Sequence, residues 1–312
     1  MVKAVLFYDE DFRLLDFGEG HPMRGDRYSK SLAEFKNLGL LGKLELMRPR
    51  LVFKEVLGLF HTQEYIKSVE QASKKGESYI GPEVPAFKGI FEVGLLSVSA
   101  GINCADAVLG GDFDVGINLC GGWHHAFEDK GRGFCIFNDI AIIAEYLLSK
   151  KVERIMIIDY DAHHGDGTQR AFYRSSKVYT VSLHQDPNTL YPFFTGFEGE
   201  LGEAEGLNFN RNFPLSVYCE DKEFIFKFSL VAEIVAGFKP EFVILQMGVD
   251  GSKECFISDM HLSEKSYSYA SKIISNLQRQ MGFGLIVLGG GGFVHPMLGR
   301  NWGIQIRNFV EN

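Results

Sequence analysis

The chain has 312 residues, of which 46% are hydrophobic and 23% are charged, and it carries a formal net charge of −8 at pH 7. This length and composition are typical of a globular protein with a large core, in one or two domains. The negative charge argues against a surface that binds nucleic acid. The apolar runs are too short to predict a membrane-spanning helix, so we expect neither nucleic acid nor a membrane as a partner.

The N-terminus and the cysteines both favour a cytoplasmic protein. The segment MVKAVLFYDEDF reaches acidic residues before any long apolar region can form, which predicts a first strand rather than a signal peptide. The cysteines include no C-x-x-C pair, and their odd, scattered set is typical of free thiols in a reducing compartment. They are Cys104, Cys120, Cys135, Cys219 and Cys255.

Short apolar runs alternate with longer segments that have helical spacing. The runs are continuous and rich in Val, Ile and Leu, which is typical of strands buried on both faces. They lie at 4–8, 115–119, 155–158, 178–183, 242–247 and 285–288, and clear helical patterns lie at 138–149, 222–238 and 263–279. This alternation predicts a single α/β domain with a mainly parallel central β-sheet flanked by helices.

Polar clusters follow five of these predicted strands. In open parallel sheets, ligands bind at the edge formed by the carboxyl ends of the strands. Five clusters at one edge are a stronger signal than any single cluster, and they predict a functional site there. In chain order they are GGWHH after 115–119, the segment Asp159 to Asp166 after 155–158, His184 after 178–183, Asp250 after 242–247 and GGGGF after 285–288.

Asp161, His163 and Asp250 have the chemistry of a metal site. Residues two apart in an extended segment point to the same side, so Asp161 and His163 could reach one ion, and Asp250 could arrive from a neighbouring strand. Three nitrogen and oxygen ligands leave a fourth position free, as at a catalytic zinc. A divalent cation would also keep neighbouring carboxylates ionised. An isolated Asp-x-His pair would more often cap a loop, but the other clusters favour the metal.

His124 and His125 are candidates for acid–base chemistry. Because they are adjacent, we expect their side chains to diverge from one turn. A neutral imidazole is the usual general base, and Asp159 and Asp166 are the candidate carboxylates that would each fix the tautomer of one imidazole. A surface turn is the alternative interpretation, which the buried strand before CGGWHH disfavours.

In the segment LGGGGF at 288–293, four successive glycines expose backbone groups where other residues would have side chains. Its glycines permit positive φ angles and the close approach of a substrate or a metal site. A phosphate-binding loop is the alternative. No Lys-Ser/Thr pair follows, however, and the spacing is not G-x-G-x-x-G, so nucleotide binding has little support.

Several longer motifs run almost from end to end of the chain. They are GEGHPMRGDR (18–27), FHTQEYIKSV (60–69), GPEVPAFKGIFE (81–92), NLCGGWHHAFEDKGRGFCIFND (118–139), IIDYDAHHGDGTQRAFY (157–173), VYTVSLHQ (178–185), LQMGVD (245–250) and LGGGGF (288–293). Together they resemble the zinc-dependent histone deacetylase family, within the arginase/deacetylase superfamily, and most closely its class I branch. The resemblance implies the arginase/deacetylase fold and a histone deacetylase-like catalytic domain over residues 1–312.

The resemblance also implies two kinds of bound cation. One zinc ion per chain would be held by Asp161, His163 and Asp250. Potassium is also expected. Its ligands would include Asp159, Asp161, His163, Ser182 and Leu183, with a second site around Phe172, Ser175 and Val178.

Catalytic and substrate-binding roles follow from the same resemblance. His124 and His125 would contact the reacting water, with His125 the better candidate for the general base. Two aromatic faces around a narrow slot suit the four-carbon stem of an acyl-lysine, although without the resemblance we would assign both aromatic residues to the core. The tunnel would be formed by Gly133, Phe134 and Tyr191, with Glu83 at its rim and Arg27 beside an inner acetate cavity.

Phe293 departs from the family pattern. Most active members carry a tyrosine here, whose hydroxyl polarises the scissile carbonyl and stabilises the oxyanion, and losing such a donor typically costs about 10²–10³ in rate. Three explanations are open. We favour an engineered replacement of tyrosine, because the rest of the motif is intact. The others are a natural, slow deacylase that prefers an activated acyl group and an inactive binder of acyl-lysine.

The predicted function is therefore zinc-dependent hydrolysis of the amide of N-acylated lysine, weak or absent in this Phe293 form. One alternative is an amidohydrolase that acts on an acetylpolyamine or another small molecule. Another is a non-catalytic binder of acyl-lysine. An arginase-like hydrolase with two manganese ions ranks lower, because Asp159 and Asp166 are already committed to the histidines.

Overall fold

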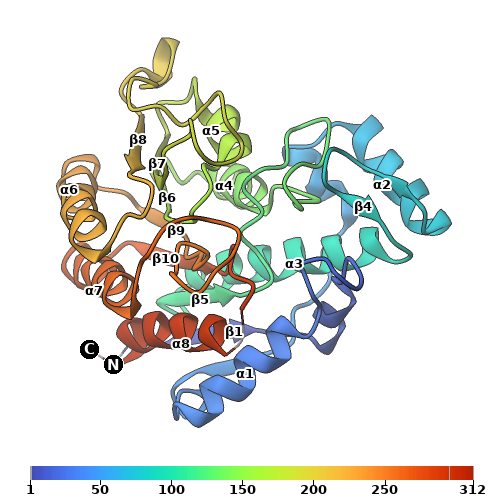
Figure 1. The fold of residues 1–312 in the computed structure, drawn as a ribbon, viewed down its shortest axis with the longest axis horizontal. Helices are drawn as coiled ribbons and strands as arrows, with labels where there is room; N and C mark the ends of the chain where they lie inside the picture. The colour runs from blue at the N-terminus through green and yellow to red at the C-terminus, as the bar shows by residue number, and fades with distance from the viewer. Residues whose placement is uncertain (1, 295, 312) are drawn as a thin grey trace.

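A parallel β-sheet of eight strands forms the centre of the fold (Figure 1). The structure is a computed structural model that describes residues 2–294 and 296–311. The strand order is β2-β1-β5-β10-β9-β6-β7-β8, and each neighbouring pair is parallel. The strands are β1 (Ala4–Phe7), β2 (Glu45–Met47), β5 (Val115–Asn118), β6 (Ile155–Asp159), β7 (Val178–Gln185), β8 (Asn210–Leu215), β9 (Phe242–Gln246) and β10 (Gly284–Leu288). The predicted α/β class is confirmed.

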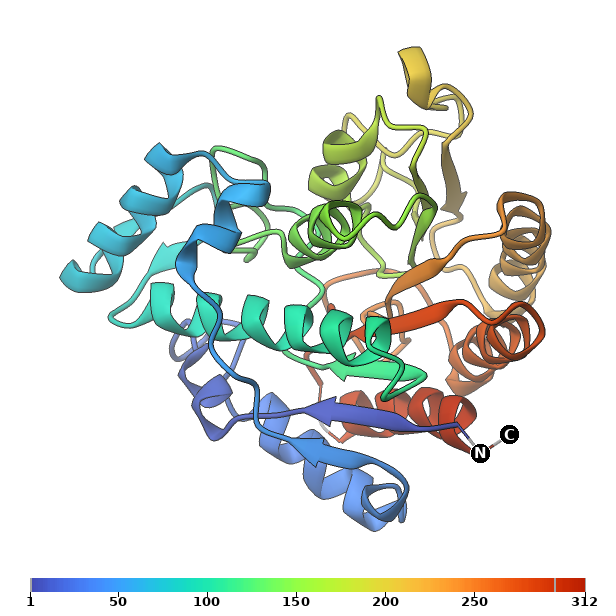
Figure 2. The ribbon, with the colours of Figure 1, turned by 180° about the vertical axis from the view of Figure 1, so that it is seen from behind.

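Helices cover both faces of this sheet (Figure 2). On one face α3 packs against β1, β5 and β10, with α2 and α4 beside it. On the other face α1, α8, α7 and α6 pack in succession. The helices are α1 (Arg27–Asn37), α2 (Gln63–Lys75), α3 (Ile90–Leu109), α4 (Asp139–Ser149), α5 (Asp166–Phe172), α6 (Asp221–Phe238), α7 (Glu264–Met281) and α8 (Met297–Val310). A separate antiparallel pair consists of β3 (Ser78–Tyr79) and β4 (Pro85–Ala86).

The predicted elements agree closely with the observed ones. Every residue of β1, β5, β6 and β9 is buried, as the continuous apolar runs indicated. Helix α4 begins after Asn138, whose side chain accepts a hydrogen bond from the backbone N–H of Ala141. Helix α7 begins after Ser263, whose side chain accepts one from Lys265. These caps satisfy backbone donors that the first turn of a helix leaves free.

Helix α3 was not anticipated from the apolar runs. It has 20 residues, and by length and composition alone it could cross a membrane, although polar residues such as Glu92 and Asp106 interrupt its apolar runs. Most of this helix is buried inside the protein, where it packs against the sheet. An apolar core helix of this length is what a wide parallel sheet requires, because the sheet must be covered on both faces.

The strand order explains why separate polar clusters meet. Strands β5, β10, β9 and β6 are consecutive neighbours in the sheet, and all run in the same direction. Their carboxyl ends therefore lie side by side, and the segments that follow them converge there.

Candidate active site

The predicted metal ligands meet at the carboxyl edge of the sheet. The ligand atoms of Asp161, His163 and Asp250 all lie within 4.8 Å of one another. The Nδ1 atom of His163 lies 3.1 Å from Asp161 Oδ1 and 2.9 Å from Asp250 Oδ2. Both aspartates are buried, and His163 is nearly so. One imidazole nitrogen and two carboxylates thus converge on one point from segments that follow β6 and β9.

The reason for this convergence differs from the one expected. Strand β6 ends at Asp159, and residues 161–163 form a bend rather than an extended segment. The backbone N–H of His163 donates a hydrogen bond to Asp161 Oδ1 at 3.1 Å, which stabilises the bend. The alternation of side chains along a strand therefore does not explain the pair.

The electrostatics of the three side chains favour a positive charge among them. Burial raises the pKa of Asp250, and the nearby charge of Asp161 adds to this, so that it reaches about 6. Burial opposes a charge on His163, yet the hydrogen bonds with the two carboxylates raise its pKa to about 10. Without a metal the carboxylates thus hold a proton on the imidazole. A divalent cation would replace that proton and satisfy the same charge, so the donor set fits a metal.

Two further groups hold Asp161 in place. Its Oδ2 atom accepts hydrogen bonds from the Gln246 side chain and from the backbone N–H of Gly291, each at 2.8 Å. A Cβ atom on Gly291 would lie 2.4 Å from Asp250 Oδ2, so only glycine permits this approach. The expectation that the glycine segment brings backbone close to the site is confirmed for the carboxylates of Asp161 and Asp250.

The tandem histidines converge instead of diverging. Their Nε2 atoms lie 3.0 Å apart, so the expectation that adjacent side chains would point apart was wrong. The opposite nitrogens diverge: His124 Nδ1 lies 2.6 Å from Asp159 Oδ2, and His125 Nδ1 lies 2.8 Å from Asp166 Oδ1. All four side chains are buried, which excludes a surface turn. Each imidazole thus has one carboxylate partner, as predicted.

The two imidazoles have different acidities. Burial would lower the pKa of His124, but the carboxylates of Asp159 and Asp161 raise it to about 9. Burial also lowers the pKa of His125, and the neighbouring His124 lowers it further, to about 4, despite the hydrogen bond with Asp166. At neutral pH His125 is therefore the uncharged member of the pair, and an uncharged imidazole can accept a proton.

A cavity of about 270 Å³ leads to these residues. Its lining includes most of the side chains expected around a substrate. They are Glu83, Gly133, Phe134, Tyr191, Arg27, His124, His125, Asp161, His163, Asp250 and Phe293, together with Met23, Tyr28, Trp123 and Ile257. The lining is predominantly apolar, and its polar groups gather around the three candidate ligands, as in sites for small molecules.

A tight turn presents Phe134 to this cavity. Gly133 and Phe134 have φ angles of 49° and 68°, and backbone hydrogen bonds join Arg132 and Cys135 in both directions. Two central residues with positive φ are typical of a type I′ turn. A non-glycine residue in this conformation is uncommon, so the turn holds the Phe134 ring at the cavity at a cost in backbone strain.

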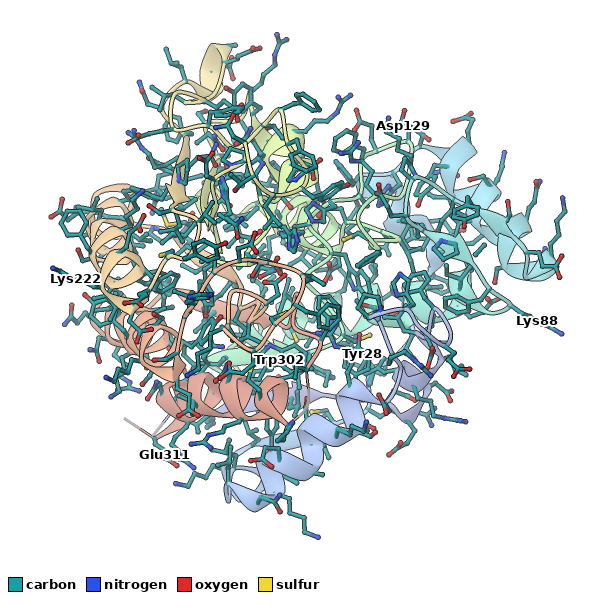
Figure 3. The ribbon with its side chains drawn as sticks, viewed as in Figure 1. Tyr28, Lys88, Asp129, Lys222, Trp302 and Glu311 are labelled. Atoms are coloured by element: carbon teal, nitrogen blue, oxygen red, sulfur yellow. The ribbon has the colours of Figure 1, made fainter. Side chains whose placement is uncertain are left out.

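Phe293 and Arg27 form the inner part of the cavity. The Phe293 ring packs edge to face on Phe134, and the Arg27 guanidinium carbon lies 5.3 Å from its centre. Arg27 is buried, and its Nη2 atom donates to the backbone oxygen of Gly290 at 2.7 Å. The same guanidinium lies over the rings of Tyr28 and Trp302, which Figure 3 labels.

His184 does not join the site. Its Nδ1 atom lies 2.8 Å from Ser182 Oγ, and its Nε2 atom lies 2.9 Å from the backbone oxygen of Gly196. Its ring packs on His164 instead of lining the cavity. Strand β7 lies outside β6 in the sheet, which displaces the end of β7 from the metal ligands.

Two polar residues at the site were missed by sequence reasoning. Gln246 ends β9 and supports Asp161, so the rule that polar residues at strand ends form the site could have identified it. Arg132 lies 3.1 Å from Asp166. It lies in a loop directly before Gly133, within the motif at 118–139, but that motif alone did not indicate which carboxylate it would reach.

Comparison with known proteins identifies the family. The model of the histone deacetylase domain matches residues 21–309. The chain belongs to the histone deacetylase family. Among curated relatives, the acetoin utilization protein AcuC of Bacillus subtilis is 33% identical over 97% of this chain and 81% of its own length. Human histone deacetylase 1 is 30% identical over 96% of this chain, which spans 63% of that relative.

Solved structures of the histone deacetylase family share the fold. The crystal structure of an HDAC homologue complexed with SAHA superposes with a TM-score of 0.89. That protein is 34% identical, and the match covers 99% of this chain and 84% of that one. The resemblance predicted from the motifs is therefore confirmed at the level of family and fold.

Proposed function

We propose that this chain is a zinc-dependent deacetylase that hydrolyses the amide of N-acylated lysine, with low activity because of Phe293. The observation that carries the proposal is the meeting of Asp161, His163 and Asp250 beside two His–Asp pairs at the end of an apolar cavity. Three protein ligands with a fourth position open suit a catalytic zinc. Family membership supports a deacetylase, and we assign the catalytic domain to residues 1–312.

The side chains suggest how the amide bond would be cleaved. Zinc, when bound, would supply Lewis acidity for the acyl oxygen and the reacting water. The Nε2 atom of His125, which lies 3.0 Å from Nε2 of His124, carries no proton of its own when Asp166 accepts the Nδ1–H on the other side of the ring, and it accepts a proton from that water. The water oxygen attacks the acyl carbon and the C–N bond breaks. The His125 and His124 pair then returns a proton to the leaving nitrogen, and the remaining proton of the water passes from the new carboxyl group to the amine, which gives a carboxylate and an ammonium group.

Phe293 limits this reaction. The side chain lines the cavity and presents only carbon to it. A hydroxyl at that place would donate a hydrogen bond to the developing oxyanion, and the absence of one such donor typically costs about 10²–10³ in rate. The intact ligands and His–Asp pairs support an impaired catalyst over an inactive binder of acyl-lysine.

The cavity suits an acylated lysine on a peptide. Phe134 and Tyr191 supply aromatic walls for a four-carbon stem, and the carboxylate of Glu83 lies at the cavity, where it could accept backbone N–H groups of a peptide. We also propose a bound potassium ion near Asp159 and Ser182, by analogy with the family. Five free, buried cysteines support a cytoplasmic location.

The proposal is tested by loading the protein with zinc and measuring acetate release from an acetyl-lysine peptide and from an acetylpolyamine. Metal-free protein is the matched control, and SAHA, to which the solved homologue is bound, serves as competitor. We expect peptide binding and slow acetate release that requires zinc and is blocked by SAHA. Faster release from the acetylpolyamine would favour the small-molecule alternative. Failure to bind zinc would contradict the proposal.

A further inference from the structure

Arg132 lies behind the cavity wall, in contact with the carboxylate that holds His125. The Nη2 atom of Arg132 lies 3.1 Å from Asp166 Oδ2, while Asp166 Oδ1 lies 2.8 Å from His125 Nδ1. One carboxylate thus bridges the guanidinium and the imidazole, with one oxygen for each. The contact with Arg132 is a largely buried ion pair, and it leaves the other oxygen of Asp166 to the imidazole of His125.

The second His–Asp pair lacks this arrangement. Asp159 Oδ2 faces His124, and its Oδ1 atom accepts the backbone N–H of Asp161 at 3.1 Å. Within residues 2–294 and 296–311, no lysine or arginine forms an ion pair with Asp159. The carboxylate of the first pair is therefore oriented by a side chain, and that of the second by the backbone.

The same turn that positions Phe134 in the cavity wall also fixes the backbone of Arg132. Arg132 is the first residue of the turn that presents Phe134, and Cys135 closes this turn through two backbone hydrogen bonds. Its guanidinium carbon lies 4.6 Å from the centre of the Phe127 ring and 5.7 Å from that of Tyr191. Its side chain is only 22% exposed. The guanidinium therefore reaches Asp166 from a fixed point.

We propose that Arg132 is a positioning residue for His125, acting through Asp166. The inference rests on the proposed function, in which His125 accepts a proton at Nε2. A carboxylate with one free oxygen can rotate or exchange partners with water. Because Arg132 engages Oδ2, Oδ1 remains directed at Nδ1 of His125, the Nδ1–H tautomer is retained, and Nε2 faces the cavity. Such outer partners commonly tune the groups that they orient.

Packing on Phe127 is the alternative role for this side chain, and Arg170 provides a matched control for it. The Arg170 guanidinium lies 5.0 Å from the centre of the same ring, but its partner is Glu128. A substitution at Arg170 removes a cation from the ring without touching Asp166. An effect that is confined to Arg132 must therefore come from the contacts that Arg170 does not share, which are those with Asp166 and with the ring of Tyr191. Arg132→Met keeps the packing on Tyr191 and removes the ion pair, so it separates these two contacts.

The direct test follows the imidazole protons by NMR in the zinc-loaded, ¹⁵N-histidine-labelled protein. Hydrogen-bonded Nδ1–H protons of His125 and His124 give separate downfield signals, and that of His124 is the internal reference. We expect Arg132→Gln to shift or broaden the His125 signal and to speed its exchange, with the His124 signal unchanged. Arg132→Lys should restore it, and Arg170→Gln should leave both signals unaltered.

Two further measurements complete the design. Arg132→Met keeps the packing on Phe127 and removes the charge, so it replaces Arg132→Gln if that variant does not fold. In the Phe293→Tyr background, the loss of Arg132 should lower kcat about tenfold and change KM by less than about twofold. An unchanged His125 signal, or an equal change in Arg170→Gln, overturns the role of Arg132. A changed signal with no turnover in any variant overturns the proposed function and leaves the positioning role standing.

Discussion

The ring of Phe293 meets the ring of Phe134 edge to face, with their centres 6.4 Å apart and their planes at 87°. Both rings line the cavity that leads to the candidate metal ligands. Neither ring carries a hydroxyl, so the oxyanion donor expected from the family is absent from this part of the wall. The pair therefore offers two facing positions in one cavity at which one oxygen atom can be added.

Phe293→Tyr is expected to increase the rate of acetyl-lysine hydrolysis by about 10²–10³, because the new hydroxyl can stabilise the oxyanion. The measurement is kcat/KM on one acetyl-lysine peptide with zinc-loaded protein. Phe134→Tyr is the control: it adds the same atom to the facing ring and should give no such gain. Equal rates for wild type and Phe293→Tyr would show that position 293 has been wrongly assigned.

Asp250→Ala should abolish stoichiometric zinc binding, because it removes one of three ligands and leaves His163 with a single carboxylate. Zinc content after dialysis provides the measurement. Zinc should also raise the unfolding temperature of the wild type, by mass action, but not that of the variant. Glu254→Ala changes an exposed acid in the same loop and should keep the metal. A variant Asp250→Ala with full zinc content would exclude the assigned ligand set.

Acid should destabilise the metal-free protein through two buried histidines. Burial lowers the pKa of His61 and of His184 to about 4 in the folded protein, below the unfolded value of about 6.5. Between about pH 6.5 and about pH 4 the unfolded chain therefore binds more protons at these histidines than the folded protein does. Stability is fully present above about pH 6.5 and falls by about 2 kcal/mol for each histidine between about pH 7.5 and pH 5.

Urea unfolding at the two pH values, with a chelator present, measures this effect. His61→Gln and His184→Gln should each reduce the difference in stability between the two pH values, whatever they do to stability itself. The exposed His261 is the control, and His261→Gln should leave the difference unchanged. If both buried variants retain the full pH dependence, the loss at acid pH arises from other groups.

Tyr191→Phe should increase the stability of the ligand-free protein by about 1 kcal/mol. The hydroxyl of Tyr191 is buried and has no hydrogen-bond partner among the described residues, and an unsatisfied buried group carries a penalty of about 1–3 kcal/mol. Thermal or urea unfolding checks this. Tyr160→Phe is the matched control, because its hydroxyl bonds to Gln305 in the core. Tyr160→Phe should lose stability. If Tyr191→Phe also loses stability, the Tyr191 hydroxyl has a hydrogen-bond partner in solution and the prediction is wrong.

The sequence was sufficient for the class of fold and for most of the site. Continuous apolar runs revealed six of the eight strands, because strands covered on both faces have no polar side to alternate with. The polar residues after these strands included the candidate metal ligands and both His–Asp pairs. These signals are local, since each depends only on the apolar residues of one short strand and on the polar residues that follow it in the sequence.

The directions of side chains were decided by the tertiary structure. The Nε2 atoms of His124 and His125 converge while their Nδ1 atoms face Asp159, at the end of β6, and Asp166, at the start of α5. His184 lies away from the candidate metal ligands because β7 is one strand further out. Arg132 reaches Asp166 only through a turn that spacing did not reveal. Such relationships depend on distances between segments far apart in the chain, and these distances exist only once the sheet has assembled.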